Sequence, residues 1–175
     1  MSLRWPVAVT ALIVSLLLLF GGYTLFQWTN LERPLKQTIA ETPTVTAKEI
    51  TVSPDKITIR LEADAHFSLT QQYPSLQKQL TAIAGGRPLE IEMLDHPDKT
   101  LNQAWGEMVF GVEEGLAHQR YSAIPAAVKK ATPSGAESYV VMDDSHLYIE
   151  IKQGEARLYR ILPLHKKESG VKDNG

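Results

Sequence analysis

Cysteine is absent from this chain of 175 residues, which excludes disulfide bonds, thiolate metal sites and a lipidated N-terminal cysteine. The sequence also lacks a glycine loop with phosphate-binding spacing and a serine in a nucleophile elbow, so no cofactor and no catalytic residue is assigned. Clustered positive charge is missing too, because residues 49–165 hold sixteen acidic against eleven scattered basic residues. A nucleic-acid partner is therefore not expected.

Charged side chains are missing from residues 5–31, a run of twenty-seven residues whose centre is almost entirely aliphatic. A helix rises about 1.5 Å per residue and must cross roughly 30 Å of hydrocarbon, so about 20 apolar residues are required. The run satisfies that length, which predicts a transmembrane helix and makes the lipid bilayer a partner. Trp5 and Trp28 bracket the run and are predicted to be membrane-interface anchors, because indole rings prefer the headgroup level.

A cleaved secretory signal peptide would also show such a run, but two features favour a retained signal anchor. The apolar stretch continues beyond Tyr23, and the small residues nearest a cleavage position, around Gly22, are flanked by bulky aromatics. A four-residue tail before the run is typical of an anchor whose N-terminus stays in the cytoplasm. These features predict a single-pass protein of the cell membrane with its C-terminal domain outside.

The chain divides into four predicted regions. These are an N-terminal transmembrane anchor (1–28), a juxtamembrane stalk or linker (29–47), an extracytoplasmic α+β domain (48–165) and a disordered tail (166–175). The linker is rich in threonine, holds two prolines and shows no sustained apolar stripe, and the tail combines three lysines with two glycines. The domain is long enough for one hydrophobic core.

Hydrophobic periodicity predicts the elements of that domain. Alternating patterns predict strands over residues 49–52, 56–62 and 88–94, and three more within 138–163. Helical spacing predicts helices over residues 74–84 and from Asp98, the expected N-cap, to a kink at Pro125. The expected architecture is a two-layer sandwich, in which a mostly antiparallel sheet carries both helices on one face.

The faces of two predicted elements bear on function. In the strand over residues 146–152, Leu147, Ile149 and Ile151 would face the helices, while Tyr148, Glu150 and Lys152 would face water. In the long helix, Val109 and Phe110 lie off the apolar stripe, which indicates either a second buried flank or an exposed contact patch. We favour ordinary burial for this pair.

Two short clusters combine carboxylates with imidazoles, which are ligands for divalent metals. They are Asp95-His96-Pro97-Asp98 and Asp143-Asp144-Ser145-His146, with His66 and His118 as further ligands. Both clusters fall where a turn or a helix cap is expected, and aspartate favours such places because it accepts bonds from nearby backbone amides. The sequence therefore favours turn chemistry, and no metal site is assigned.

Tyrosines at the end of the chain give the strongest indication of a contact surface. Tyr148 should lie on the outer face of the last sheet region, with Tyr139 and Tyr159 beside it, and clustered tyrosines favour interfaces. Partial burial at the sheet edge is the competing interpretation. The sequence predicts a membrane-anchored, non-enzymatic, extracytoplasmic binding or assembly module that contacts a membrane or cell-envelope protein. The alternatives are an extracytoplasmic ligand sensor and a cryptic metal-dependent hydrolase using His66, Asp95, His96 or His146.

Overall fold

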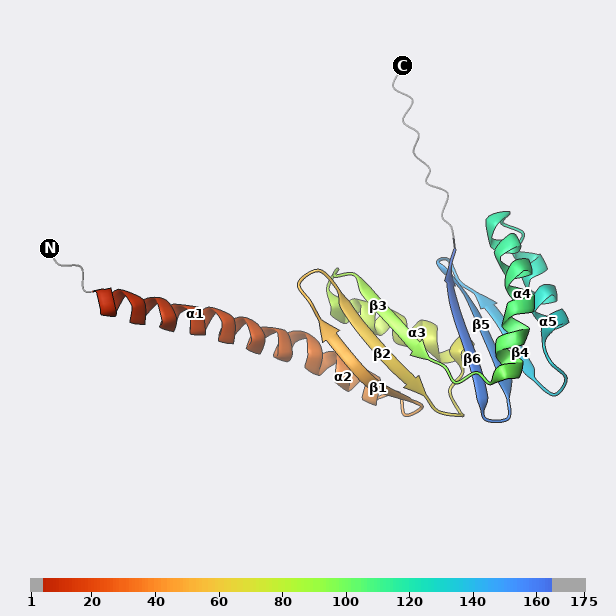
Figure 1. The fold of residues 1–175 in the computed structure, drawn as a ribbon, viewed down its shortest axis with the longest axis horizontal. Coiled ribbons are helices and arrows are strands. Elements are labelled where there is room, and N and C mark those ends of the chain that lie inside the picture. Colours follow the sequence, from red (N-terminus) through yellow and green to blue (C-terminus); the bar gives the residue numbers. More distant parts are fainter. Residues whose placement is uncertain (1–4, 165–175) are drawn as a thin grey trace, which may run out of the picture. The chain divides into compact units, whose positions relative to one another are not determined.

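A computed structural model describes residues 5–164 of the chain (Figure 1). The predicted disordered tail, residues 166–175, lies outside the described residues. The elements in chain order are α1 (Trp5–Gln27), the π-helix η1 (Trp28–Glu32), α2 (Arg33–Ala40), β1 (Val45–Val52), β2 (Ile57–Ala63), α3 (Leu69–Ala84), β3 (Leu89–Leu94), α4 (Lys99–Ala117), the 3-10 turn η2 (Tyr121–Ala123), α5 (Ile124–Ala131), β4 (Glu137–Met142), β5 (His146–Gln153) and β6 (Ala156–Pro163).

The fold is α+β with two small sheets, and the predicted single two-layer sandwich is wrong. One sheet has the strand order β1-β2-β3 and the other has the order β4-β5-β6. The described residues form two compact units, one of residues 5–61 and 76–92 and one of residues 62–75 and 93–164. Hydrophobic periodicity located the strands, but it does not show which strands pair. In the structure the first three strands form one sheet and the last three form another.

Helix α1 requires a second correction. The side chains of α1 are described over residues 9–19 and at position 21. Among the residues that the structure describes, no helix is long and apolar enough to span a bilayer. On this finding the predicted transmembrane helix, the single-pass signal anchor and the membrane localisation with an outward domain are wrong. The side chains of Trp5 and Trp28, the predicted interface anchors, lie outside the described part.

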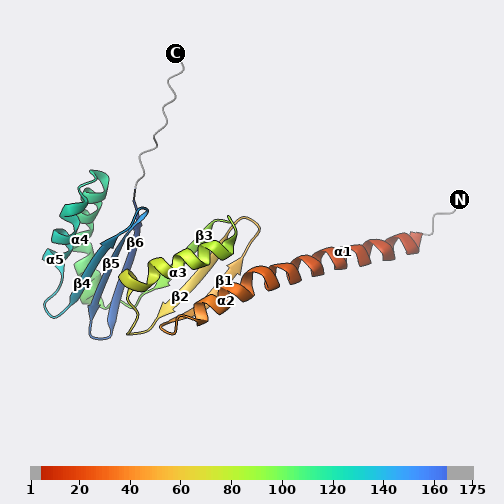
Figure 2. The ribbon, with the colours of Figure 1, turned by 180° about the vertical axis from the view of Figure 1, so that it is seen from behind.

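The first unit contains the sheet β1-β2-β3, with α2 and α3 on the same face (Figure 2). Strand β1 runs opposite to β2, whereas β2 and β3 point the same way (Figure 1). In β2 the alternate residues Ile57, Ile59 and Leu61 are all fully buried, which agrees with the alternating pattern of that strand. Residues 29–47, predicted as a linker, contain α2 and the start of β1 and contribute buried side chains to this unit, namely Leu31, Leu35, Ile39 and Val45.

The second unit contains the sheet β4-β5-β6, both of whose strand pairs are antiparallel. One face of the sheet packs against α4 and α5, and the predicted inward residues Leu147, Ile149 and Ile151 are confirmed as members of that core. Asp98 caps α4 as predicted, because its Oδ1 accepts the backbone N–H of Leu101 at 2.8 Å. The exposed Phe110 contradicts the expected burial, since 79% of its surface is accessible.

Two glycines explain how closely α4 and α5 approach. A Cβ atom at Gly111 would lie 2.8 Å from Ala127 Cβ, and one at Gly115 would lie 2.5 Å from Ile124 Cγ1. Neither distance leaves room for a side chain, so these positions require glycine for packing. Gly106, on the same helix, has open space around it.

Segment 62–75 covers the opposite face of the β4-β5-β6 sheet. Phe67, Leu69 and Tyr73 are buried, and the rings of Tyr73 and Tyr148 have centroids 5.7 Å apart. The predicted water-exposed face of β5 is therefore wrong, because Tyr148 and Glu150 are completely buried. The predicted start at Pro74 of the helix over residues 74–84 is also wrong, since α3 begins at Leu69 and contains that proline.

Candidate functional site

Strand β4 is one of the two edge strands of the second sheet; the other, β6, is bridged at Arg157 by His96. Its residues pair with β5 from Glu137 opposite Lys152 to Met142 opposite Leu147, and in the strand order no described strand lies on its other side. An unpaired edge presents backbone N–H and C=O groups that can hydrogen-bond another extended chain. Three large side chains of this strand are substantially exposed, with accessible fractions of 45% for Tyr139, 42% for Val141 and 46% for Met142.

The two faces of β4 differ because successive side chains of a strand point to opposite sides. Tyr139 and Val141 lie opposite Glu150 and Tyr148 in the register, so they share the face that segment 62–75 covers farther along the sheet. Val140 points to the other side and packs against the α4 and α5 core. The covering segment thus shields Tyr148 and Glu150 on β5 but leaves much of Tyr139 and Val141 exposed.

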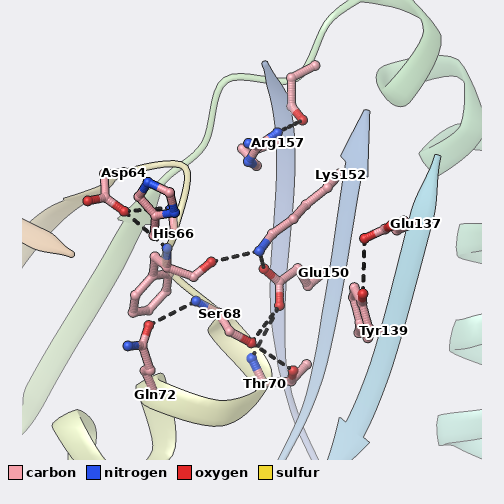
Figure 3. Close-up of polar contacts among 12 residues, drawn as sticks. Asp64, His66, Ser68, Thr70, Gln72, Glu137, Tyr139, Glu150, Lys152 and Arg157 are labelled. Atoms are coloured by element: carbon pink, nitrogen blue, oxygen red, sulfur yellow. Dashed lines mark hydrogen bonds and ion pairs between the residues drawn. The ribbon is translucent and has the colours of Figure 1, made fainter. Parts of the chain in front are cut away.

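A hydrogen bond fixes Tyr139 on this face. Its hydroxyl donates to Glu137 Oε2 at 3.0 Å, as Figure 3 shows. This bond and the charge of the Glu137 carboxylate raise the pKa of Tyr139. The phenol therefore stays neutral and presents its ring at the edge over the physiological pH range.

A hollow of about 500 Å³ borders β4 on its helix side. It is open to solvent and combines apolar with polar groups from α5, the connection that follows α5, and β4. The lining residues are Pro125, Lys129, Thr132, Pro133, Ala136, Ser138 and Val140. The edge strand thus exposes Tyr139 and Val141 on one face and borders a hollow on the other.

A buried polar group lies next to the edge, centred on Glu150 of β5. This side chain is fully buried, and its Oε1 lies 2.8 Å from Lys152 Nζ. Its Oε2 accepts a hydrogen bond from the Ser68 hydroxyl at 3.3 Å and a long one from the backbone N–H of Thr70 at 3.5 Å. Lys152 Nζ also donates to the backbone oxygen of Phe67 at 2.7 Å (Figure 3).

This polar group joins segment 62–75 to the sheet and is closed to solvent at the carboxylate. The contact of Glu150 Oε1 with Lys152 is an ion pair without hydrogen-bond geometry. The buried hydroxyl of Tyr159 has no hydrogen-bond partner among the residues that the structure describes. Burial, with a smaller contribution from the Glu150 charge, raises the pKa of Tyr159 to about 12. A carboxylate with no accessible surface does not reach an outside substrate, so we interpret the Glu150 group as structural.

The cluster around Asp143 forms a turn. Asp143 Oδ1 accepts the backbone N–H groups of Ser145 and His146, both at 2.7 Å, and its Oδ2 accepts the Tyr148 hydroxyl at 2.6 Å. Burial raises the pKa of this carboxyl, but the hydrogen bonds together outweigh burial and lower it to about 2. All these contacts hold the β4–β5 connection in place.

Two other candidate metal ligands, Asp95 and His96, also have protein partners. Asp95 Oδ2 lies 2.6 Å from Arg160 Nη1, and this guanidinium stacks over the Trp105 ring at 5.0 Å. His96 Nε2 lies 3.2 Å from Glu62 Oε1. No group of three or more potential ligands occurs among the residues that the structure describes.

The three predicted contact tyrosines have different environments. Tyr139 is exposed on β4, whereas Tyr148 is fully buried and Tyr159 is 5% exposed. The two buried rings pack against segment 62–75, as Tyr159 also makes an edge-to-face contact with Phe67 at 6.1 Å. Sequence reasoning missed Val141 and Met142 as exposed neighbours of Tyr139, although three successive apolar residues before Asp143 break the alternation and could have indicated them.

Comparisons with known proteins add no relationship to this picture. No protein family, no curated protein and no solved structure matches the chain.

Proposed function

We propose that this chain is a non-enzymatic protein-binding or assembly module, and that it docks its partner along the open edge of the second sheet. The observation that carries the proposal is the row of exposed side chains on β4, Tyr139, Val141 and Met142, on a strand with one unpaired side. Large exposed apolar groups on an edge strand cost solubility unless a partner covers them, and natural proteins usually protect such edges with charge or proline.

The chemistry of the strand supports this use. β4 contains one charged residue, Glu137, and that carboxylate accepts the bond from Tyr139. Tyrosine and methionine are enriched in protein interfaces. The strand therefore combines backbone hydrogen-bonding groups with the side chains that interfaces favour.

A metal-dependent hydrolase and a ligand sensor have less support. The most deeply buried carboxylate, Glu150, is neutralised by Lys152 and is inaccessible. The hollow along β4 is an open surface feature, whereas a sensor would need an enclosed apolar pocket for its ligand. We therefore favour protein binding over these two functions.

Site-specific photocrosslinking in the native cells tests the proposal with the full chain. A photoreactive residue in place of Tyr139 should give one discrete adduct with a partner protein. The same residue in place of Ala117, exposed on α4, should not give that adduct. The substitution Val141→Lys, which adds charge to the edge, should lower the adduct yield at least fivefold, and the matched control Ala117→Lys should leave it unchanged.

The opposite result is equally clear. If the adduct forms to the same extent from position 117, or survives Val141→Lys while circular dichroism shows an intact fold, the edge strand is not the docking surface. A partner that contacts another face would then have to be sought from the crosslinks themselves.

A further inference from the structure

We infer that the partner segment is an extended peptide that adds to β4 as a fourth strand, with an acidic side chain directed into the hollow beside α5. This inference rests on the proposed function and specifies the chemistry of the ligand. We expect the peptide to be acidic, because the lining residues of the hollow include one basic residue, Lys129, and no acidic residue.

The path of the chain indicates which lining residues lie at each end of the hollow. Helix α5 ends at Ala131 and β4 begins at Glu137, so the short connection places the end of the helix beside the start of the strand. Pro125, near the start of α5, must then lie toward the Val140 end of β4. Thr132, which follows the helix, lies toward Ser138. The hollow is therefore apolar at the Val140 end and polar at the Ser138 end.

Lys129 provides the charge in the wall. It lies four residues after Pro125, so both occupy one face of α5, and both line the hollow. Lys130 is the next residue and points to a different side, where it lines separate hollows together with Glu107 of α4. The two neighbouring lysines thus face different surfaces, and only Lys129 faces the edge strand.

The alternating side chains of an added strand would fit the two ends of the hollow. Side chains on one face of a strand repeat every two residues, about 6.6 to 6.8 Å apart, and strands pair at roughly 4.8 Å. Two successive inward side chains would therefore lie beside Ser138 and Val140. An acidic residue at the first position would approach Lys129, and an apolar residue at the second would pack on Pro125 and Val140.

The outward side chains of the same segment would meet the exposed face of β4. Tyr139 and Val141 favour aromatic and β-branched partners in cross-strand pairs. The recognised segment thus has an acidic and an apolar residue two positions apart on one face, and apolar residues on the other. Main-chain pairing would supply affinity and the hollow would supply selectivity, as in other cases of strand addition.

Three labelled synthetic peptides test the inference by fluorescence anisotropy with the full chain. The first has the core Thr-Asp-Val-Val-Val-Thr, the second carries lysine in place of aspartate, and the third is the first with alternate core amides N-methylated. We expect the aspartate peptide to bind at least tenfold more tightly than the lysine peptide at low salt. Raising the salt should reduce this ratio, because the contact with Lys129 is partly exposed. The N-methylated peptide should bind at least tenfold more weakly than the first, since it cannot pair with β4.

Two matched variants test whether Lys129 supplies the charge that the aspartate peptide contacts. Lys129→Glu should weaken the aspartate peptide at least fivefold, and Lys130→Glu should change its affinity less than twofold. Both lysines are exposed on α5, so circular dichroism should show the same fold in the two variants. Val141→Lys should weaken the aspartate and lysine peptides alike.

Each contrary outcome has one meaning. One contrary outcome is that the aspartate and lysine peptides bind equally and Lys129→Glu weakens neither. If Val141→Lys still weakens both peptides, the preference for an acidic peptide is overturned, but β4 remains the docking strand. Equal effects of the two lysine variants would also overturn that preference. If no peptide binds, strand addition of this class is overturned, and the crosslinking from position 139 decides separately whether the edge binds a protein.

Discussion

Removal of Lys152 should be far more damaging than removal of an exposed lysine, because it would leave the buried carboxylate of Glu150 without its cation. The side chain of Glu150 has no accessible surface and that of Lys152 has 21%, and the two charged atoms lie 2.8 Å apart. Lys152→Met keeps much of the aliphatic stem while it removes the ammonium group. The contacts that remain to the carboxylate are those from Ser68 and Thr70, at 3.3 and 3.5 Å.

The expected loss follows from the cost of a buried, unpaired charge. Breaking a buried ion pair by removing one partner costs about 3 to 5 kcal/mol. The remaining hydrogen bonds and the partial exposure of Lys152 reduce this, so we expect about 2 to 4 kcal/mol. A second change that removes the charge, in the double variant Glu150→Gln with Lys152→Met, should recover at least half of the loss.

Urea unfolding of the full chain, followed by circular dichroism, measures these differences. The matched control is Lys56→Met, which breaks another lysine–glutamate pair of the same chain. Lys56 Nζ lies 3.0 Å from Glu90 Oε2, but the two side chains are 53% and 63% exposed. An exposed pair of this kind contributes about 0 to 1 kcal/mol, so the control should unfold nearly like the parent.

The reasoning would be refuted if Lys152→Met lost less than about 1 kcal/mol, the range typical of an exposed pair. It would also fail if the double variant were as unstable as the single variant, since the damage would then come from lost packing rather than from the unpaired charge.

Three further predictions concern packing and pH. Gly115→Ala should destabilise the fold by about 1 to 3 kcal/mol, because the added Cβ would lie 2.5 Å from Ile124 Cγ1. The control Gly106→Ala has open space around it and should be neutral or stabilising by about 0.5 to 1 kcal/mol. Thermal melting of the two variants measures the difference. The pKa of Asp143 is about 2 in the folded chain, so its contribution to stability, present above pH 4, should disappear as the pH falls toward 2, and Asp143→Asn should abolish this dependence in acid titrations. The pKa of Tyr159 rises to about 12, so stability should be lost between pH 10 and 12, and Tyr159→Phe should reduce the loss in alkaline unfolding curves.

Local patterns allowed correct prediction where one neighbour decides the structure. Asp98 was predicted as a cap because its side chain bonds an amide three residues away, and the structure has that bond. The inward face of Leu147, Ile149 and Ile151 followed from alternation alone. Both predictions use residues close together in the chain.

The remaining predictions were wrong because they depend on contacts between residues far apart in the sequence. Alternation correctly placed Tyr148 and Glu150 on the second face of β5, but it does not reveal that segment 62–75 covers that face. The covering contact joins Ser68 to Glu150, eighty-two positions apart. The available signal was a glutamate within the apolar run 147–151 of β5, since such a residue needs a partner when it is buried.

Limits on how the protein can be divided follow from the path of the chain. The second unit takes residues 62–75 from between two parts of the first, so its sequence is discontinuous. An expressed fragment starting at Met93 would lack the strip that shields Tyr148, Glu150 and Tyr159, and it should aggregate even though all three strands of its sheet are present. Truncation mapping of a binding region would then report loss of folding as if it were loss of contact, so point substitutions at the edge are the safer guide.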